Sequence, residues 1–152
     1  MPTIIAIVIA VIAIGVAIGA WFRPIPNPEA PAAKTYSDQQ VADAQKAVCD
    51  AYSLVHNAII VTNNKSGGSD PTAILAVAAN ARLSAHAGGQ YLADILSQYP
   101  ATQSDLAQGI RDLATNLEKL TLEYLGETPN ADQDPLLRSA DDATSQIKQH
   151  CK

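Results

Sequence analysis

The sequence predicts an all-α protein, in which an N-terminal transmembrane helix precedes an extracytoplasmic antiparallel four-helix bundle. Three observations support this fold class. The segment 4–22 is apolar and carries no charge, and the segment 23–35 contains alternating prolines. The remainder has apolar residues spaced three and four apart, which is typical of amphipathic helices. We therefore divide the chain into an anchor (1–22), a Pro/Ala-rich linker (23–35) and a helical bundle domain (36–152).

Residues 4–22 are long enough to cross a lipid bilayer as a helix. Nineteen residues at about 1.5 Å each span about 28 Å, which is close to a hydrocarbon core of about 30 Å. Trp21 and Phe22 stand where an interfacial aromatic belt is expected, and Arg23 ends the apolar run. The alternative is a cleaved signal peptide, because residues 30–32 (Ala-Pro-Ala) resemble a cleavage site, although a basic n-region is missing.

Small residues in this segment favour packing against another transmembrane helix. Gly15 and Gly19 form a GxxxG pattern, and Ala6 and Ala10 add small residues at helical spacing. Such a strip allows two helices to approach closely in the membrane. The expected partners are therefore the bilayer itself and either a second copy of the chain or another membrane protein. The simpler interpretation is that small residues are common in Ala-rich anchors.

The charge of the domain excludes several classes of partner. From Tyr36 onward the chain has fourteen acidic and eight basic side chains. Nucleic-acid binding requires clustered Lys and Arg to neutralise phosphates, so we expect no nucleic-acid partner. The same balance argues against binding to anionic lipid headgroups.

Cys49 and Cys151 are the only cysteines, and one lies near each end of the domain. Such a pair is typical of a single disulfide in an oxidising compartment. Closing a loop of this length removes unfolded-state entropy worth about 4–5 kcal/mol in the ideal case. The alternative is two buried free thiols in a cytoplasmic domain.

Two signals disagree about the orientation of the domain. Arg23 and Lys34 follow the apolar segment and favour a cytoplasmic C-terminal domain by the positive-inside rule. The cysteine pair favours the opposite side. We give the cysteines more weight, because Glu29 offsets the two basic residues and sizeable domains translocate regardless of flanking charge. The prediction is a single-pass plasma-membrane protein with an extracytoplasmic C-terminal domain.

The first two helices of the domain have clear start signals. Ser37 and Gln40 form a capping box that opens a helix to about Thr62. Asp70-Pro71 is an N-cap followed by proline at the first helical position, and the second helix ends at Tyr99-Pro100. The apolar positions of the two helices are Val41, Ala44, Val48, Ala51 or Tyr52, Val55 and Ile59, then Ile74, Val77 or Ala78, Ala81, Ala85, Leu92, and Ile95 or Leu96.

Gly88 and Gly89 interrupt the pattern of the second helix. Each glycine costs about 1 kcal/mol relative to alanine within a helix, so the pair requires a reason. The pair either allows close contact with a neighbouring helix or breaks the segment in two. We favour close packing, because Ala85 and Ala87 are also small.

The third and fourth helices complete the predicted bundle. Thr102 and Asp105 form a second capping box, and Gly126 is placed as the C′ residue of the third helix. Asp134-Pro135 is the start signal of the fourth helix. The apolar faces comprise Leu106, Ile110, Leu113, Leu117, Leu120 and Tyr124, then Leu137, Ala140, Thr144, Ile147 and Cys151. Short loops favour an up-down-up-down arrangement in which the first and last helices are neighbours.

The domain lacks a recognisable catalytic or metal-binding motif. His56, His86 and His150 lie on three different predicted helices, and no His or Cys pair has a ligand spacing. Ser84, two residues before His86, points to a different helix face, so the two do not make a nucleophile and base. We therefore predict no metal, no cofactor and no enzymatic activity.

Several segments together resemble those of a known group of proteins. An uncharged anchor and a Pro/Ala linker are followed by QVADAQKAVCDAY, then DPTAILAVAANARL, and finally a terminal Cys-Lys. This order resembles small Ala-rich, single-pass membrane proteins of mycobacteria and related actinomycetes. The resemblance implies an extracytoplasmic helical domain with a Cys–Cys bridge, but it assigns no reaction and no functional residues.

Two functional hypotheses follow. The first is a non-enzymatic accessory or scaffold subunit that docks onto a larger complex of the plasma membrane or cell envelope, supported by the GxxxG strip and the missing catalytic set. The second is a tethered module whose Ala/Gly-lined bundle opens around Gly88-Gly89 to hold a lipid or another apolar ligand.

Overall fold

The computed structural model describes residues 35–152 as four helices with no strand among them. They are α2 (Asp38–Asn63), α3 (Pro71–Gln98), α4 (Ser104–Leu125) and α5 (Asn130–His150). The all-α prediction is confirmed for this part of the chain.

The predictions for the N-terminal segment lie outside the described residues. They comprise the transmembrane helix, its strip of small residues (Ala6, Ala10, Gly15 and Gly19), the interfacial group (Trp21, Phe22 and Arg23) and nearly all of the linker. In the part of the chain that is described, no helix combines the length and apolar character needed to cross a membrane.

The starts of α2 and α3 confirm the predicted capping signals. The Ser37 hydroxyl accepts the Gln40 N–H at 3.3 Å, and the Gln40 side chain accepts the Ser37 N–H at 2.9 Å. At α3, the Asp70 carboxylate accepts the Thr72 N–H at 2.8 Å, with Pro71 at the first helical position. Both side chains satisfy backbone donors that have no partner within the helix.

The capping box predicted at the start of α4 is wrong. The N-cap is Gln103, and no side chain caps the helix. The Thr102 hydroxyl instead donates to the Tyr99 carbonyl at 2.7 Å. Tyr99 is the C-cap of α3, and carbonyls at a helix C-terminus lack a partner within the helix. The threonine therefore satisfies the end of one helix rather than the start of the next.

The predicted start of α5 at Pro135 is also wrong, because the helix begins at Asn130. Two bonds hold this additional turn: the Asp132 N–H donates to the Pro129 carbonyl at 2.9 Å, and the buried Gln133 amide donates to the Thr128 carbonyl at 2.7 Å. Pro135 removes one backbone donor, a cost that the anchored first turn tolerates.

The end of α4 differs from its prediction by one residue. Gly126 is the C-cap with an ordinary negative φ, and Glu127 is the residue in the left-handed region, with φ 54°. The Thr128 N–H donates to the Glu123 carbonyl at 3.0 Å, as in a Schellman motif. The chain therefore places a glutamate where glycine is preferred.

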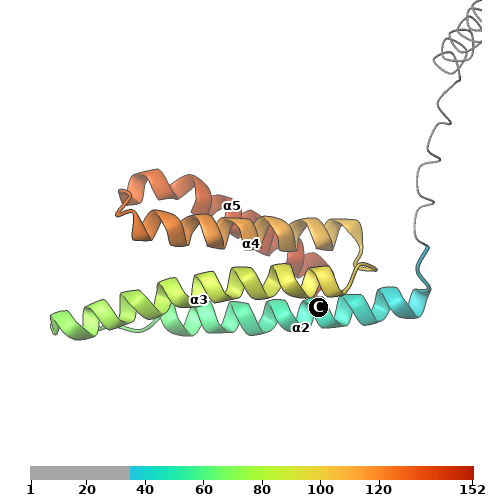
Figure 1. Ribbon diagram of the computed structural model, residues 1–152, viewed down its shortest axis with the longest axis horizontal. Coiled ribbons are helices and arrows are strands. Elements are labelled where there is room, and N and C mark those ends of the chain that lie inside the picture. Colours follow the sequence, from blue (N-terminus) through green and yellow to red (C-terminus); the bar gives the residue numbers. More distant parts are fainter. Residues whose placement is uncertain (1–34) are drawn as a thin grey trace, which may run out of the picture. The chain divides into compact units, whose positions relative to one another are not determined.

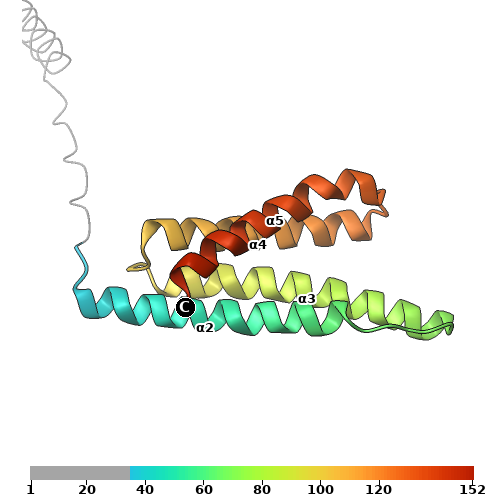
Figure 2. The same cartoon turned by 180° about the vertical axis from the view of Figure 1, so that it is seen from behind.

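Consecutive helices run antiparallel, and each packs along the next (Figure 1). α4 lies between α3 and α5. α5 crosses α4 obliquely and meets α2 only along a short stretch (Figure 2). The predicted contact between the first and last helices exists, but it is too short to close the bundle along its length.

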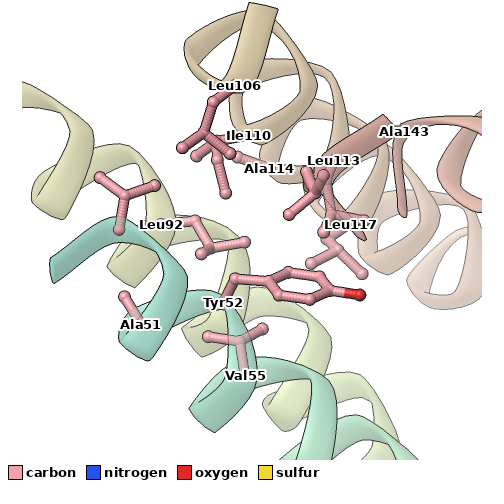
Figure 3. Packing of buried hydrophobic residues seen from close by; sticks show 12 residues of the cluster. Ala51, Tyr52, Val55, Leu92, Leu106, Ile110, Leu113, Ala114, Leu117 and Ala143 are labelled. Carbon is pink, nitrogen blue, oxygen red and sulfur yellow. The ribbon is translucent and has the colours of Figure 1, made fainter. Parts of the chain in front are cut away.

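The core lies within residues 36–152, which form one compact unit. Leu92 of α3 meets the leucine-rich face of α4, and Tyr52 of α2 lies against the same face (Figure 3). The largest fully buried side chains are Val48, Leu92, Leu106, Ile110 and Ile147. α4 is the most extensively buried of the four helices, since its leucine-rich face packs into the core and it contacts both α3 and α5.

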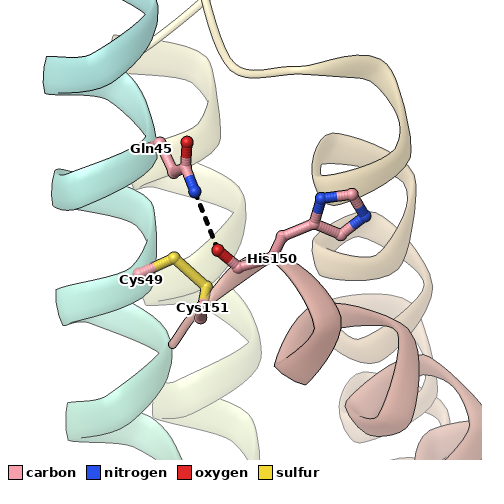
Figure 4. Close-up of a disulfide and its surroundings, with 4 residues drawn as sticks. All are labelled: Gln45, Cys49, His150 and Cys151. Atoms are coloured by element: carbon pink, nitrogen blue, oxygen red, sulfur yellow. Dashed lines mark hydrogen bonds between the residues drawn. A yellow bond between two sulfur atoms is a disulfide. The ribbon is translucent and has the colours of Figure 1, made fainter.

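A disulfide joins Cys49 of α2 to Cys151, which follows α5, with the two Cα atoms 5.4 Å apart. Beside it, the Gln45 side-chain amide donates to the His150 carbonyl at 2.8 Å (Figure 4). We call this region the disulfide end. The opposite end, formed by the connections 64–70 and 126–129, is called the open end (Figure 1).

Candidate functional site: an apolar groove towards the open end

All four helices line a groove of about 470 Å³. The apolar residues that line it are Val55, Ile59 and Ile60 of α2, Ala78, Ala81 and Ala85 of α3, Leu113, Leu117, Leu120 and Tyr124 of α4, and Leu137 and Ala140 of α5. Its volume lies within the range of small-molecule sites, about 300–1,000 Å³, and its lining has the predominantly apolar character of such sites.

The groove exists because small side chains face a region where the helices separate. Ala78, Ala81 and Ala85 are spaced three and four apart on α3, so they share one helix face. Farther along α3, Leu92 is fully buried against α4. The α3 and α4 ribbons diverge towards the open end (Figures 1 and 2). The alanine side chains of α3 are too short to fill the space between the two helices there. The alanines therefore leave space that a larger side chain would fill.

Gly88 and Gly89 lie within the unbroken helix α3 and are buried. A Cβ atom on Gly88 would lie 2.6 Å from Val55 Cγ1, and one on Gly89 would lie 3.0 Å from the Ala114 carbonyl oxygen. These distances agree with close packing of α3 against α2 at Gly88 and against α4 at Gly89. The pair does not line the groove. The groove lining on α3 ends at Ala85, next to the predicted opening, and the helices pack closely at the glycine pair itself.

Polar groups contribute to the groove from three helices. Arg82 of α3 and His56 of α2 are half-buried, and Asp141 of α5 is exposed. The His56 ring stacks on Tyr52 with the ring centroids 5.4 Å apart. Burial, followed by the positive charge of Lys148, lowers the pKa of His56. The groove is thus mostly apolar, with a few polar groups that can orient a ligand.

The Tyr52 hydroxyl is buried beside the groove. It makes no hydrogen bond of regular geometry to the described residues. Burial raises the pKa of Tyr52, and the Thr144 hydroxyl on α5 partly offsets this rise. A buried hydroxyl that makes no regular hydrogen bond costs free energy, and the nearby Thr144 hydroxyl offsets only part of that cost.

The structure does not bring the histidines or the Ser84 group together as a reactive site. Ser84 shares a hydrogen bond of 2.8 Å with Thr62, whereas His86 contacts Glu118 at 2.9 Å. Within residues 35–152, no group of three or more His, Cys, Asp or Glu side chains is arranged to hold a metal ion.

Exposed large apolar side chains gather towards the open end. Leu122 and Leu125 of α4 are 68% and 65% exposed, and Leu75 of α3 is 66% exposed. Others in the helical segments that lead to this end are Ile60, Val61, Ile74 and Leu137. Exposed apolar side chains at one end of a domain are candidates for an interaction surface. Leu137, predicted to face the core, is one of these exposed residues.

Sequence reasoning missed the location of the groove and the role of Gly109. A Cβ atom on Gly109 would lie 3.0 Å from Ile147 Cγ1, so this glycine lets α5 approach α4 closely. The sequence signal for the groove is that one face of α3 carries alanines whereas one face of α4 carries leucines. That signal requires knowing that the two faces oppose each other.

Comparison of the sequence and structure with protein-family models, curated proteins and solved structures gives no significant match. The resemblance to actinobacterial membrane proteins therefore stays a prediction.

Proposed function

We propose that the helical domain is a binding module that holds an apolar ligand in the groove between its four helices. The observation that supports this proposal is the groove itself, about 470 Å³ lined largely by Ala, Leu, Ile and Val side chains. Burial of an apolar chain there is favourable by about 0.8 kcal/mol for each methylene removed from water. The module performs no chemical step.

Saturated alkyl chains of increasing length test this proposal on the segment 36–152, which contains the whole core and the disulfide. We expect a 1:1 complex by native mass spectrometry and isothermal titration. The affinity should rise about fourfold per methylene until the groove is full. A domain that binds no chain of any length contradicts the proposal.

A matched pair of variants locates the binding. Ala81→Leu places a larger side chain in the groove, whereas Ala79→Leu makes the same change at an exposed position that does not line it. We expect Ala81→Leu to weaken binding at least tenfold and Ala79→Leu to leave it unchanged. Equal effects of the two variants would place the ligand elsewhere.

A second candidate function is that of an accessory or scaffold subunit of a larger membrane complex. The observation that favours it is the exposed apolar surface towards the open end, which includes Leu122 and Leu125. A photo-crosslinking residue at Leu125 should give one defined adduct in the native membrane. The same residue at the exposed Gln108 of α4 should give none. Adducts at both positions, or at neither, contradict docking through this surface.

We propose further that residues 4–22 anchor the domain in the plasma membrane and that the domain lies outside the cytoplasm. The uncharged apolar segment supports the anchor, and the cysteine pair supports the oxidising side. The chain should stay in the membrane fraction at alkaline pH. A membrane-impermeant maleimide should label Cys49 and Cys151 in intact cells only after reduction. Free thiols reached only after cell lysis would contradict this orientation.

A further inference from the structure

Arg82 and Asp141 are the two residues of opposite charge that line the groove, and Arg82 is the less exposed of the two. It is half-buried on α3, one residue after Ala81 of the apolar wall. The ion pairs among residues 35–152 join Lys46 with Asp50, His86 with Glu118 and Arg138 with Asp134, and none includes Arg82. A guanidinium at the wall of an apolar groove, without a carboxylate partner among the described residues, is available to bind an anionic group of a ligand.

We infer that the groove takes a single-chain amphiphile with an anionic carboxylate, such as a long-chain fatty acid, and that Arg82 binds the carboxylate. This inference rests on the proposed function. The alkyl chain lies along the leucines of α4 and the alanines of α3, and the carboxylate accepts hydrogen bonds from the guanidinium. The planar fork of arginine matches the two oxygens of a carboxylate.

Asp141 of α5 is the group that opposes this assignment. It also lines the groove, and a carboxylate there repels an anionic ligand and attracts a cationic one. Asp141 is exposed, however, whereas Arg82 is half-buried. Solvent and salt screen the exposed charge more strongly, so the interaction with Arg82 is the larger one. The domain carries more acidic than basic side chains, which slows the approach of an anion without removing this local contact.

The test compares palmitic acid, hexadecanol and hexadecylamine on the segment 36–152 by isothermal titration at low and physiological salt. The three probes share a sixteen-carbon chain and differ only in the headgroup. We expect the acid to bind about ten to a hundred times more tightly than the alcohol, because a hydrogen bond to a charged group has a value of that size. The amine should bind more weakly than the acid.

Variants assign the difference to the proposed residue. Arg82→Gln should reduce the affinity for the acid to that for the alcohol and leave the alcohol unchanged. Arg111→Gln, at an exposed arginine of α4 that does not line the groove, should change neither. Asp141→Asn should strengthen binding of the acid severalfold.

The outcomes separate this inference from the proposed function. Equal affinity for the acid and the alcohol, or stronger binding of the amine, overturns the carboxylate assignment while the groove remains a binding site. Failure of all three probes to bind overturns both. Equal loss of acid and alcohol binding in Arg82→Gln overturns the role of Arg82, because a change in groove shape would then explain the effect.

Discussion

The two ends of the bundle use the same helices with opposite results. At the disulfide end, fully buried side chains such as Leu92 and Ile147 fill the space between helices, and a covalent bond joins the first helix to the end of the chain. Towards the open end, alanines face leucines across an apolar groove, and large apolar side chains are exposed. A short contact between α2 and α5, reinforced by the disulfide, therefore holds one end of the bundle closed while the helices leave a groove towards the other end.

Removal of the disulfide should have the largest effect on this contrast. Cys49→Ala combined with Cys151→Ala removes a covalent link between residues 102 positions apart. Apart from this link, α2 and α5 share only a short contact. We expect the free energy of unfolding to fall by about 2–5 kcal/mol. Urea denaturation of the variant and of the reduced wild-type protein measures the loss. A loss below about 1 kcal/mol would mean that helix packing alone holds this end together.

Truncation of one leucine at each end should sharpen the comparison. Leu92→Ala removes a side chain that is 0% exposed, and a loss of about 3 kcal/mol is expected from the cavity it leaves. Leu137→Ala removes one that is 41% exposed, so the loss should stay below about 1 kcal/mol. Equal losses in urea denaturation would mean that the groove is closed in solution.

Addition of volume should have opposite effects at two positions of α3. Gly88→Ala forces a Cβ to 2.6 Å from Val55, whose branched side chain has little rotamer freedom in a helix. We expect a net loss of about 1–2 kcal/mol, because overpacking exceeds the gain in helix propensity. Ala81→Leu adds atoms to the groove, and a gain of about 1 kcal/mol is expected. Thermal unfolding followed by circular dichroism compares the two, and destabilisation by Ala81→Leu would contradict the groove.

Tyr52→Phe tests how the buried Tyr52 hydroxyl affects stability, between the disulfide end and the groove. The substitution keeps the ring and removes a buried hydroxyl that lacks a regular hydrogen bond. We expect the free energy of unfolding to rise by about 1 kcal/mol. Thr144→Val is the matched control, since it removes the hydroxyl that faces Tyr52 from α5. A clear loss of stability in Tyr52→Phe would show that the hydroxyl has a partner in solution.

The smallest expected effect is a pH dependence from His56. Burial and Lys148 lower the pKa of His56 below its unfolded value of 6.5, so the unfolded chain binds a proton first as the pH falls. Stability is therefore complete above pH 6.5 and declines below it until the folded protein is also protonated. His56→Gln should reduce this decline in urea denaturation between pH 7.5 and 5. Lys148→Gln should reduce it partly, and an unchanged slope in both would contradict the assignment.

Much of the fold could be predicted because local signals determine it. The Ser37 and Asp70 caps and the leucine spacing of α4 depend on residues a few positions apart. The errors arose where local signals compete. Thr102 has a nearer acceptor at the end of α3, and Gln133 stabilises a turn ahead of Pro135, the predicted helix start.

The groove was not predictable to the same degree, because it depends on tertiary geometry. The small residues of α3 are visible in the sequence, but the predicted opening at Gly88-Gly89 is a place where the missing side chains allow a close approach of the helices. Alanine at positions 78, 81 and 85 leaves space because α3 and α4 diverge towards the open end (Figure 1). The short α2–α5 contact that permits this divergence has no signature within any single helix.

The disulfide also determines how the molecule responds to proteolysis. All three connections between helices lie inside the ring that Cys49 and Cys151 close. A protease that cuts the exposed connection 64–70 therefore leaves two fragments in one covalent species. Such a nicked form migrates as an intact chain on a non-reducing gel and separates only after a reductant is added.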